Sequence, residues 1–331
     1  MRKPLISLLV PVYNQEKKLC KALVSIDNAV SNAMRKDIQV ILYDDGSTDA
    51  SLDIIRFWQD RQKILLDDRH CDVKVIHDKQ NAGYGHAMNV MLEAADGKYI
   101  GILEPDDELT DNYFNVFEDA LDDFDYDVVK AMYLTDKEEC SLSKQVRLER
   151  LTGVWKKDVP IDLLLHHPSI WSAIYKTDFL KENDIRFEQA PGAGWVDNLF
   201  LFKTILLAKS IYISDDTVYS YSKTQTDNSM INFKVDVPIR RMYAVRNWLK
   251  SFYHAKTKED IPEDVLYVFS FRVSQYIELI VDKYCVASEQ DIQMLVDGLV
   301  QWCSVKSLYE HGNSGYADRL WMYQQNLWLK D

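Results

Sequence analysis

The sequence predicts an α/β fold, with a mostly parallel central sheet flanked by helices and a C-terminal helical extension. Two observations support this class. Over the first 135 residues, short apolar runs alternate with stretches whose apolar residues recur at helical spacing. Such alternation implies crossover connections between parallel strands. From about residue 236 to 331 the pattern is mostly helical, with Phe269, Val273, Tyr276 and Ile280 on one apolar face.

The apolar runs give the expected strands in order: residues 5–12, 38–43, 73–76, 99–103 and 128–132. Helical spacing between them predicts three helices. Their apolar residues are Leu19, Leu23, Ile26 and Val30 in the first, Leu52, Ile55 and Phe57 in the second, and Met88, Leu92 and Ala95 in the third. Residues 47–49, Ser-Thr-Asp, are a good cap for the second helix.

Polar side chains gather directly after four of these strands. The clusters are Tyr13 with Asn14, Asp44 with Asp45, residues 78–83 and residues 104–107. In open α/β sheets, ligands lie beyond the carboxyl ends of the strands. The sequence therefore predicts that four loops far apart in the chain converge on one crevice.

The composition restricts the classes of function. Of the 331 residues, 47% are hydrophobic and 27% are charged, which suits a packed core rather than global disorder. The net charge of −13 argues against nucleic acid as the main ligand, because binding a phosphate backbone needs a basic surface. The five cysteines are scattered without a CxxC pair, so we expect a reducing compartment and no zinc site.

We expect a cytoplasmic protein without a signal peptide or a membrane span. The apolar run at residues 5–12 is short and contains Ser7 and Pro11, so a buried strand is the better interpretation. No run of 18 apolar residues occurs. Peripheral contact with the inner membrane face is left open by Arg240, Arg241 and Arg246, although a solvated helix face is the favoured interpretation.

The acidic residues Glu104, Asp106 and Asp107 form the candidate metal site. Adjacent carboxylates repel one another unless a cation lies between them. A divalent cation, Mn²⁺ or Mg²⁺, accepts carboxylate and phosphate oxygens together and would neutralise a diphosphate leaving group. Taken alone, these residues are more simply explained as a helix cap, and Asp44 with Asp45 as a turn. Two acidic strand ends in one sheet shift the balance towards a shared ligand site.

The ordered set of motifs resembles the family-two glycosyltransferases, which have the GT-A fold. The resemblance covers about residues 5–225 and is densest before residue 110. Each motif is weak alone, whereas the set in this order and spacing is specific. The motifs are Leu-Val-Pro-Val-Tyr-Asn-Gln-Glu at 9–16, Tyr-Asp-Asp-Gly-Ser-Thr-Asp at 43–49, Asn-Ala-Gly at 81–83 followed by Asn89, Gly-Lys-Tyr-Ile at 97–100, and Glu-Pro-Asp-Asp at 104–107.

This resemblance implies roles for individual residues. The implied nucleotide-binding residues are Pro11, Val12, Tyr13, Glu16, Asp45, Asn81, Gly83 and Asp106, with Asp45 contacting a uracil-type base. The implied metal ligands are Asp107, Asp106 and Glu104. Glu104 departs from the family, because many relatives have an Asp there. Met88 also departs, because relatives often have a basic residue that contacts the donor phosphate, a contact that would be lost here unless His86 replaces it.

Asp197 is the candidate general base of an inverting transfer. It follows a Gly-rich loop and opens a helical stretch, at the place where relatives carry a Glu-Asp pair or a lone Asp. Val196 replaces the Glu, and a helix cap is the alternative explanation. Trp195 could stack on the acceptor sugar. His166 or His167 could be a third metal ligand or line the donor sugar, although such a pair is more often structural or solvated. Tyr219 and Tyr221, followed by residues 222–229, lie where relatives place a loop over the donor.

The expected reaction moves a sugar from a nucleotide sugar, with UDP as the preferred carrier, to a glycan or to a lipid- or protein-linked saccharide of the bacterial capsule or surface type. Residues 1–230 would form the GT-A domain, with a nucleotide-binding half at 1–110 and an acceptor half at 111–230, and residues 231–331 a helical region. A homo-oligomer is left open. The alternatives are a sugar-nucleotide nucleotidyltransferase and a catalytically degenerate protein that binds a nucleotide sugar and a partner.

Overall fold

A computed structural model describes residues 3–35, 37–65, 71–137, 140–145, 151–156, 160–189, 194–222, 236–283 and 288–325. The chain divides into two compact units that interleave along the sequence. The first comprises residues 1–160, 169–193 and 206–227, and the second comprises residues 161–168, 194–205 and 228–331. A division at residue 230 between a GT-A domain and a helical region stays a prediction.

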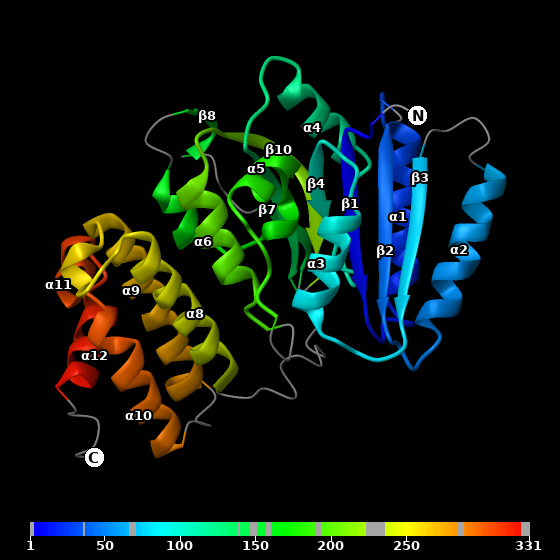
Figure 1. Ribbon diagram of the computed structural model, residues 1–331. Coiled ribbons are helices and arrows are strands. Elements are labelled where there is room, and N and C mark those ends of the chain that lie inside the picture. Colours follow the sequence, from blue (N-terminus) through cyan, green and yellow to red (C-terminus); the bar gives the residue numbers. More distant parts are fainter. Residues whose placement is uncertain are drawn as a thin grey trace. The chain divides into compact units, whose positions relative to one another are not determined.

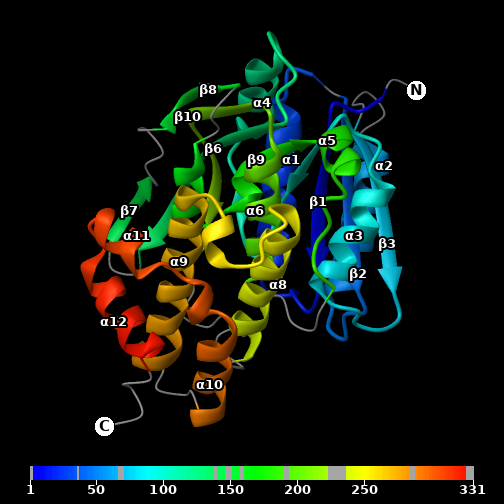
Figure 2. The ribbon, with the colours of Figure 1, turned by 60° about the vertical axis from the view of Figure 1, so that its left-hand side comes forward.

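The first unit begins with the expected alternation of strands and helices (Figure 1). The elements are β1 (Ile6–Val12), α1 (Leu19–Asn32), β2 (Ile38–Asp45), α2 (Ser51–Leu65), β3 (Cys71–Asp78), α3 (Tyr84–Ala94) and β4 (Tyr99–Ile102). Every residue of β1 and β2 is buried. Strands buried on both faces need helices on both sides of the sheet, and Figures 1 and 2 show α3 on one face and α1 on the other.

The rest of the first unit completes one ten-stranded sheet in the order β3-β2-β1-β4-β9-β6-β10-β5, with β7 pairing to β6 and β8 to β10. The added elements are β5 (Glu108–Leu109), α4 (Tyr113–Leu121), β6 (Val128–Lys137), β7 (Cys140–Gln145), β8 (Gly153–Trp155), the 3₁₀ turn η3 (Ile170–Ser172), β9 (Ala173–Lys176), α5 (Thr177–Glu182) and β10 (Ile211–Tyr221).

The α/β class is confirmed, but the parallel arrangement is confined to part of the sheet. Strands β3, β2, β1 and β4 are parallel to one another, and β6 is also parallel to β10. Strand β9 is antiparallel to both β4 and β6. The sheet is therefore mixed, and its longest run of parallel strands is made by the first 102 residues.

One expected core position is wrong. Phe57 was assigned to the apolar face of α2, but its side chain is 74% exposed, whereas Ile55 and Trp58 are buried. Positions three apart lie on the same face of a helix, while positions two apart do not. The indole of Trp58 also donates a hydrogen bond to Asp27 at 3.1 Å, which fixes this face of α2 against α1.

A buried polar network joins the amino ends of the three central strands. The hydroxyl of Ser7 donates to Gln39 Oε1 at 2.7 Å and accepts from the backbone N–H of Gly97 at 2.8 Å. The amide of Gln39 also donates to Asp72 and Asp96. Ser7 and Gln39 are at most 1% exposed. Because buried polar groups are costly when unpaired, this network favours a single register of β1, β2 and β4.

The second unit is helical in its described residues. After the turn η2 (Ile161–Leu165) and the helix α6 (Asp197–Leu207), whose last two residues belong to the first unit, it continues with α8 (Asp236–Phe252), η4 (Lys258–Asp260), α9 (Glu263–Ile277), η5 (Glu278–Lys283), α10 (Glu289–Gly298), η6 (Val300–Trp302), α11 (Val305–Glu310) and α12 (Ser314–Gln324). Phe269, Val273, Tyr276 and Ile280 are buried, as their spacing predicts. Among the described helices, none has both the length and the apolar character of a membrane span.

Helix α3 is held tightly against the segment that follows α5. The side chain of Asn89 donates to the carbonyl of Phe187 and accepts from its N–H, both at 2.9 Å, and so substitutes for a backbone partner. At Gly85, an added Cβ would overlap the carbonyl oxygen of Glu188. Glycine is therefore required at this position by close approach of two backbones.

We predict that Gly85→Ala lowers the free energy of unfolding by about 1–3 kcal/mol, because the new methyl group must displace backbone atoms. Gly315→Ala is the matched control, since Gly315 is also the second residue of its helix but has open space around it. That substitution should be neutral or stabilise by up to about 1 kcal/mol, since alanine favours the helix. Urea denaturation measures both, and equal effects would contradict the packing argument.

Candidate active site

Three loops leave the same edge of the sheet because β1 is parallel to both of its neighbours. Val12 at the end of β1 is in register with Asp44 of β2. On the other side, Leu9 is in register with Ile102 at the end of β4. The loops after β1, β2 and β4 therefore begin at neighbouring positions, and the predicted convergence is present in the first unit.

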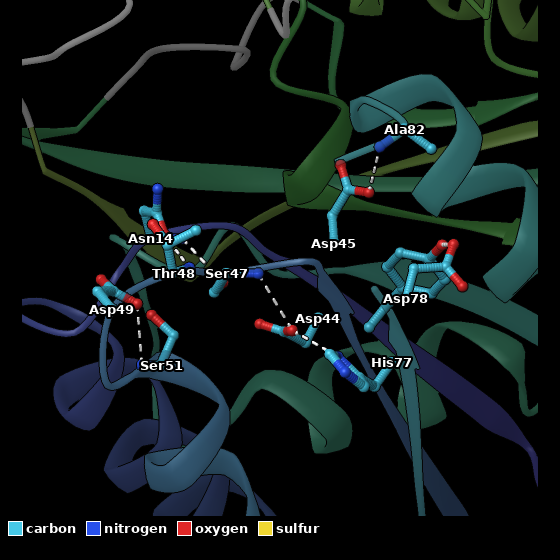
Figure 3. A network of polar contacts seen from close by, with 11 residues as sticks. Asn14, Asp44, Asp45, Ser47, Thr48, Asp49, Ser51, His77, Asp78 and Ala82 are labelled. Atoms are coloured by element: carbon cyan, nitrogen blue, oxygen red, sulfur yellow. Dashed lines mark hydrogen bonds and ion pairs between the residues drawn. The ribbon is translucent and has the colours of Figure 1, made fainter. Parts of the chain in front are cut away.

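The loop after β1 is tied to the loop after β2. Asn14 has a left-handed backbone conformation with φ of 51°. Its side-chain oxygen accepts from the N–H of Thr48 at 2.8 Å (Figure 3). The carboxylate of Glu16 accepts from the N–H of Ala50 at 3.1 Å, at the start of α2. Glu16 thus has a structural capping contact, whatever its role towards a nucleoside.

Exposure distinguishes the predicted base-binding residues of this loop. Pro11 and Val12 are buried in β1, whereas Tyr13 is 43% exposed. Pro11 is accommodated in a buried strand because β4 stops pairing with β1 at Leu9. The Tyr13 side chain is therefore the part of this segment that can stack on a planar ligand.

Adjacent carboxylates at the end of β2 point in different directions (Figure 3). Asp45 accepts from the N–H groups of Ala82 and Gly83 at 2.8 and 2.9 Å. Asp44 lies 2.8 Å from Nδ1 of His77 and accepts from the N–H of Ser47 at 3.3 Å. A carboxylate has about four lone-pair sites, so Asp45 can hold the turn and still accept a further hydrogen bond.

The turn that Asp45 holds requires glycine. Gly83 has φ of 94° and ψ of 156°, a conformation that is essentially restricted to glycine. Asn81, one of the implied nucleotide-binding residues, is exposed in the same turn. Asp45 is thus joined to the turn of Asn81 and Gly83 at the start of α3, and the binding of a nucleotide by these residues stays a prediction.

Met88 is fully buried in α3. The departure from a basic residue at this position is therefore explained by packing, because the side chain belongs to the core. His86 is half-buried, with Nε2 3.5 Å from Asp78 and its ring edge-on to Tyr43. Contact of His86 with a donor phosphate stays a prediction.

The three candidate metal ligands after β4 have separate partners. Glu104 accepts from the hydroxyl of Tyr84 at 2.6 Å. Asp106 forms an ion pair with Lys18 at 3.2 Å. Within the residues that the structure describes, no three His, Cys, Asp or Glu side chains form a ready-made metal site. Binding of a cation would therefore require rearrangement or oxygens supplied by a ligand.

Asp107 is the most deeply buried member of the acidic cluster, at 1% exposure. The hydroxyl of Tyr219 donates to its Oδ2 at 2.9 Å, and the N–H of Ser222 donates to its Oδ1 at 2.8 Å. Burial, with a smaller contribution from the charge of Asp106, raises the pKa of Asp107 to about 8. A buried carboxylate beside other acids is stabilised in its charged form by a cation.

These properties fit a divalent-cation site whose coordination is completed by oxygens of a bound ligand. Mg²⁺ and similar hard ions are often held by one or two carboxylates together with substrate phosphates and water. Each of the three acids already has a hydrogen-bond or ion-pair partner in the protein, so the shares of Asp107, Asp106 and Glu104 in such a site stay predictions.

Tyr219 was expected in a loop over the donor, but it is a fully buried residue of β10. Its hydroxyl also accepts from the N–H of Glu104 at 3.0 Å, and its ring stacks on Trp171 at 4.1 Å. Tyr221 stacks on the same indole at 5.2 Å. Most of the expected loop, residues 223–229, lies outside the described residues.

The candidate general base belongs to the second unit. Asp197 is the first residue of α6 and is partly exposed. Burial raises its pKa to about 6, and the charges of Arg272 and Arg241 oppose this rise. A carboxylate with a pKa near 6 is ionised at neutral pH and can accept a proton.

The neighbouring candidates also lie in the second unit. Trp195 has φ of 56° and packs edge-on against Tyr276. His167 is exposed. The contacts of Trp195 and His167 with a sugar stay predictions.

Sequence reasoning missed two residues of the first unit. Lys18 and Tyr84 contact the acidic cluster, although they lie 88 and 20 positions from their partners. Tyr84 directly follows the Asn-Ala-Gly turn, so its proximity to the crevice could have been inferred. Nothing in the sequence separates Lys18 from its neighbour Lys17.

Comparison with known proteins shows the family of the chain. The family described as Glycosyl transferase family 2 matches residues 7–182. Glycosyltransferase GlyG of Streptococcus pneumoniae serotype 4 is 27% identical over 234 residues, covering 66% of this chain and 71% of GlyG. The poly(ribitol-phosphate) beta-N-acetylglucosaminyltransferase TarS of Staphylococcus aureus is 25% identical over 68% of this chain and 36% of TarS.

Solved structures show the same fold. The crystal structure of S. aureus TarS residues 1–349 in complex with UDP-GlcNAc has a TM-score of 0.72 at 20% identity, covering 97% of this chain and 92% of that chain. Mannosyltransferase PcManGT from Pyrobaculum calidifontis, in complex with GDP-Man and Mn²⁺, has a TM-score of 0.52 at 15% identity, covering 100% and 89%. The expected GT-A fold is thereby confirmed.

We predict that Asp107→Asn stabilises the metal-free protein at pH 8 but not below pH 4. A carboxyl whose pKa is raised by folding contributes stability at low pH, and this contribution is lost as the pH rises from 3.8 towards 8. Asparagine removes that loss, so the variant should gain about 2 kcal/mol or more at pH 8. Urea denaturation in EDTA measures the difference. A pH-independent difference, or the same gain in the exposed control Asp111→Asn, would contradict the prediction.

Proposed function

The chain belongs to glycosyl transferase family 2, and we propose that it is an inverting, metal-dependent enzyme that transfers a sugar from a UDP-sugar to a saccharide acceptor. The observation that carries this proposal is the convergence of the Tyr13, Asp45 and Asp107 loops at one sheet edge. The ring of Tyr13 can stack on a nucleobase, the carboxylate of Asp45 can accept a hydrogen bond from that base, and the buried acid Asp107 can hold a cation at the diphosphate. The family favours a transferase over the nucleotidyltransferase alternative.

In the proposed donor site, Tyr13 stacks on the base and Asp45 accepts a hydrogen bond from it. Asp106 and Asp107 hold a divalent cation, which would neutralise the diphosphate as the sugar–phosphate bond breaks. The UDP-GlcNAc in the TarS complex makes a UDP-N-acetylhexosamine the first donor to test. The Mn²⁺ in the PcManGT complex supports Mn²⁺ as the first cation to test.

In the proposed transfer step, Asp197 accepts the proton of the acceptor hydroxyl. The hydroxyl oxygen bonds to the anomeric carbon as the bond to the diphosphate breaks, and the anomeric configuration inverts. The name of TarS supports a polyol-phosphate polymer as the first acceptor to test. A catalytically degenerate protein would bind the donor and transfer nothing.

We predict that a UDP-sugar with Mn²⁺ raises the melting temperature by about 5 °C or more at saturating donor, because the ligand binds only the folded state. The panel is UDP-GlcNAc, UDP-GalNAc, UDP-glucose and GDP-mannose, each with Mn²⁺ or EDTA. Asp107→Asn should lose the Mn²⁺-dependent part of the shift, whereas Asp111→Asn should keep it. A full Mn²⁺-dependent shift in Asp107→Asn would refute its role in metal binding.

We predict that Asp197→Asn keeps the donor-induced shift but loses transfer by about 100-fold or more, because a general base contributes at least that factor. Asp178→Asn is the matched control, since Asp178 is also an acid in the first turn of a helix but is exposed. Transfer is measured by release of UDP in the presence of a saccharide acceptor. Unchanged turnover in Asp197→Asn would exclude it as the base and favour a capping role.

A further inference from the structure

Two arginines of the C-terminal helices are buried in the second unit, which also contains Asp197. Arg272 of α9 is 6% exposed, and Arg241 of α8 is 2% exposed. Burying a guanidinium group is costly unless its N–H donors are hydrogen-bonded and its charge is paired. The contacts of these arginines therefore indicate what the helices contribute to the proposed acceptor side.

Arg272 fixes the backbone of the turn before His167. Its Nε donates to the carbonyl of Leu164 at 2.8 Å, and its Nη2 donates to the carbonyl of His166. Its Nη1 donates to the side chain of Gln275 at 3.3 Å. The planar guanidinium thus holds two carbonyls of one turn at once, a geometry that lysine cannot reproduce.

Tyr276 lies one helical turn after Arg272 and contacts the segment of Asp197. The side-chain amide of the fully buried Asn198 donates to the Tyr276 hydroxyl at 2.8 Å and lies 3.2 Å from Asp197 Oδ1. The ring of Trp195 packs edge-on against Tyr276. Arg241 adds a hydrogen bond from its Nε to the carbonyl of Gly194 at 3.3 Å.

We infer that one turn of α9 positions the proposed base for transfer: Tyr276 holds Asn198 beside Asp197, and Arg272, one helical turn earlier, is a positioning residue that fixes the turn before His167. The inference rests on the proposed role of Asp197 as the base. The charged and titratable groups that act on Asp197 from α8 and α9 are Arg241, Arg272 and Tyr276. The C-terminal helices would thereby form part of the transfer machinery.

The experiment compares Arg272→Gln, Arg272→Lys and Tyr276→Phe with wild type, with the exposed Arg56→Gln as control. Initial rates with donor, Mn²⁺ and a saccharide acceptor give kcat, KM and their pH dependence. Arg272→Gln should lower kcat at neutral pH by about 100-fold, because a displaced base loses its alignment. It should also move the acid limb of kcat towards higher pH by about one unit or more, because a positive charge lowers the pKa of a nearby carboxyl.

The other variants separate the effect of the positive charge of Arg272 from the effect of its hydrogen-bond geometry. Arg272→Lys should leave the acid limb in place and still lower kcat, because it keeps the charge and loses the planar fork. Tyr276→Phe removes a single hydroxyl and serves as the variant least apt to unfold. It should lower kcat by about tenfold, since one hydrogen bond to a buried group is lost. The donor-induced melting shift should stay intact in all variants.

Wild-type transfer and an inactive Asp197→Asn establish the proposed function independently. With that established, wild-type kcat and an unmoved acid limb in Arg272→Gln would overturn the inference and leave the function standing. Loss of the donor-induced shift in both Arg272→Gln and Tyr276→Phe would also overturn it, because the role would then be general stability. In an Asp197→Asn background, Arg272→Gln should cost little further, and a full additional loss would contradict coupling between the two residues.

Discussion

The candidate donor site depends on the parallel pairing of β1 with β2 on one side and with β4 on the other. Parallel neighbours end at the same edge, so three loops separated by up to 90 residues start side by side. Short polar contacts join these loops to one another through Asn14 with Thr48 and Lys18 with Asp106. Asp45 in addition holds Gly83 in the turn after β3. The pairing of the strands sets the positions of the acidic loops, and the local hydrogen bonds and ion pairs orient the acidic side chains.

Two carboxylates of the proposed reaction owe their different behaviour to their surroundings. Asp107 lies beside Asp106 and Glu104, so its charged form is disfavoured in the protein alone. Burial also raises the pKa of Asp197, but the charges of Arg272 and Arg241 oppose the rise, so its pKa reaches only about 6. Environments that differ in this way assign different tasks to chemically identical groups. A metal ligand and a general base can thus coexist in one chain.

The pattern of apolar residues was sufficient to predict β1 to β4 and the three helices between them, because continuous apolar runs mark the fully buried strands and helical spacing marks the helices. It could not predict Phe57, where an apolar side chain is exposed, or the antiparallel β9, whose direction depends on the path of the chain. Side-chain contacts such as Tyr84 with Glu104, or Arg272 with Leu164, are also invisible to it. They depend on distances between segments that no local spacing encodes.

The polar network of Ser7, Gln39 and Gly97 lies at the opposite end of the strands from the acidic loops. The alignment of the central strands is thus secured at a place where no substrate is expected to bind. The loops at the other end can then change in length and chemistry without the strands slipping past one another. One scaffold could in this way accept different sugars and acceptors over evolutionary time while its backbone framework stays the same.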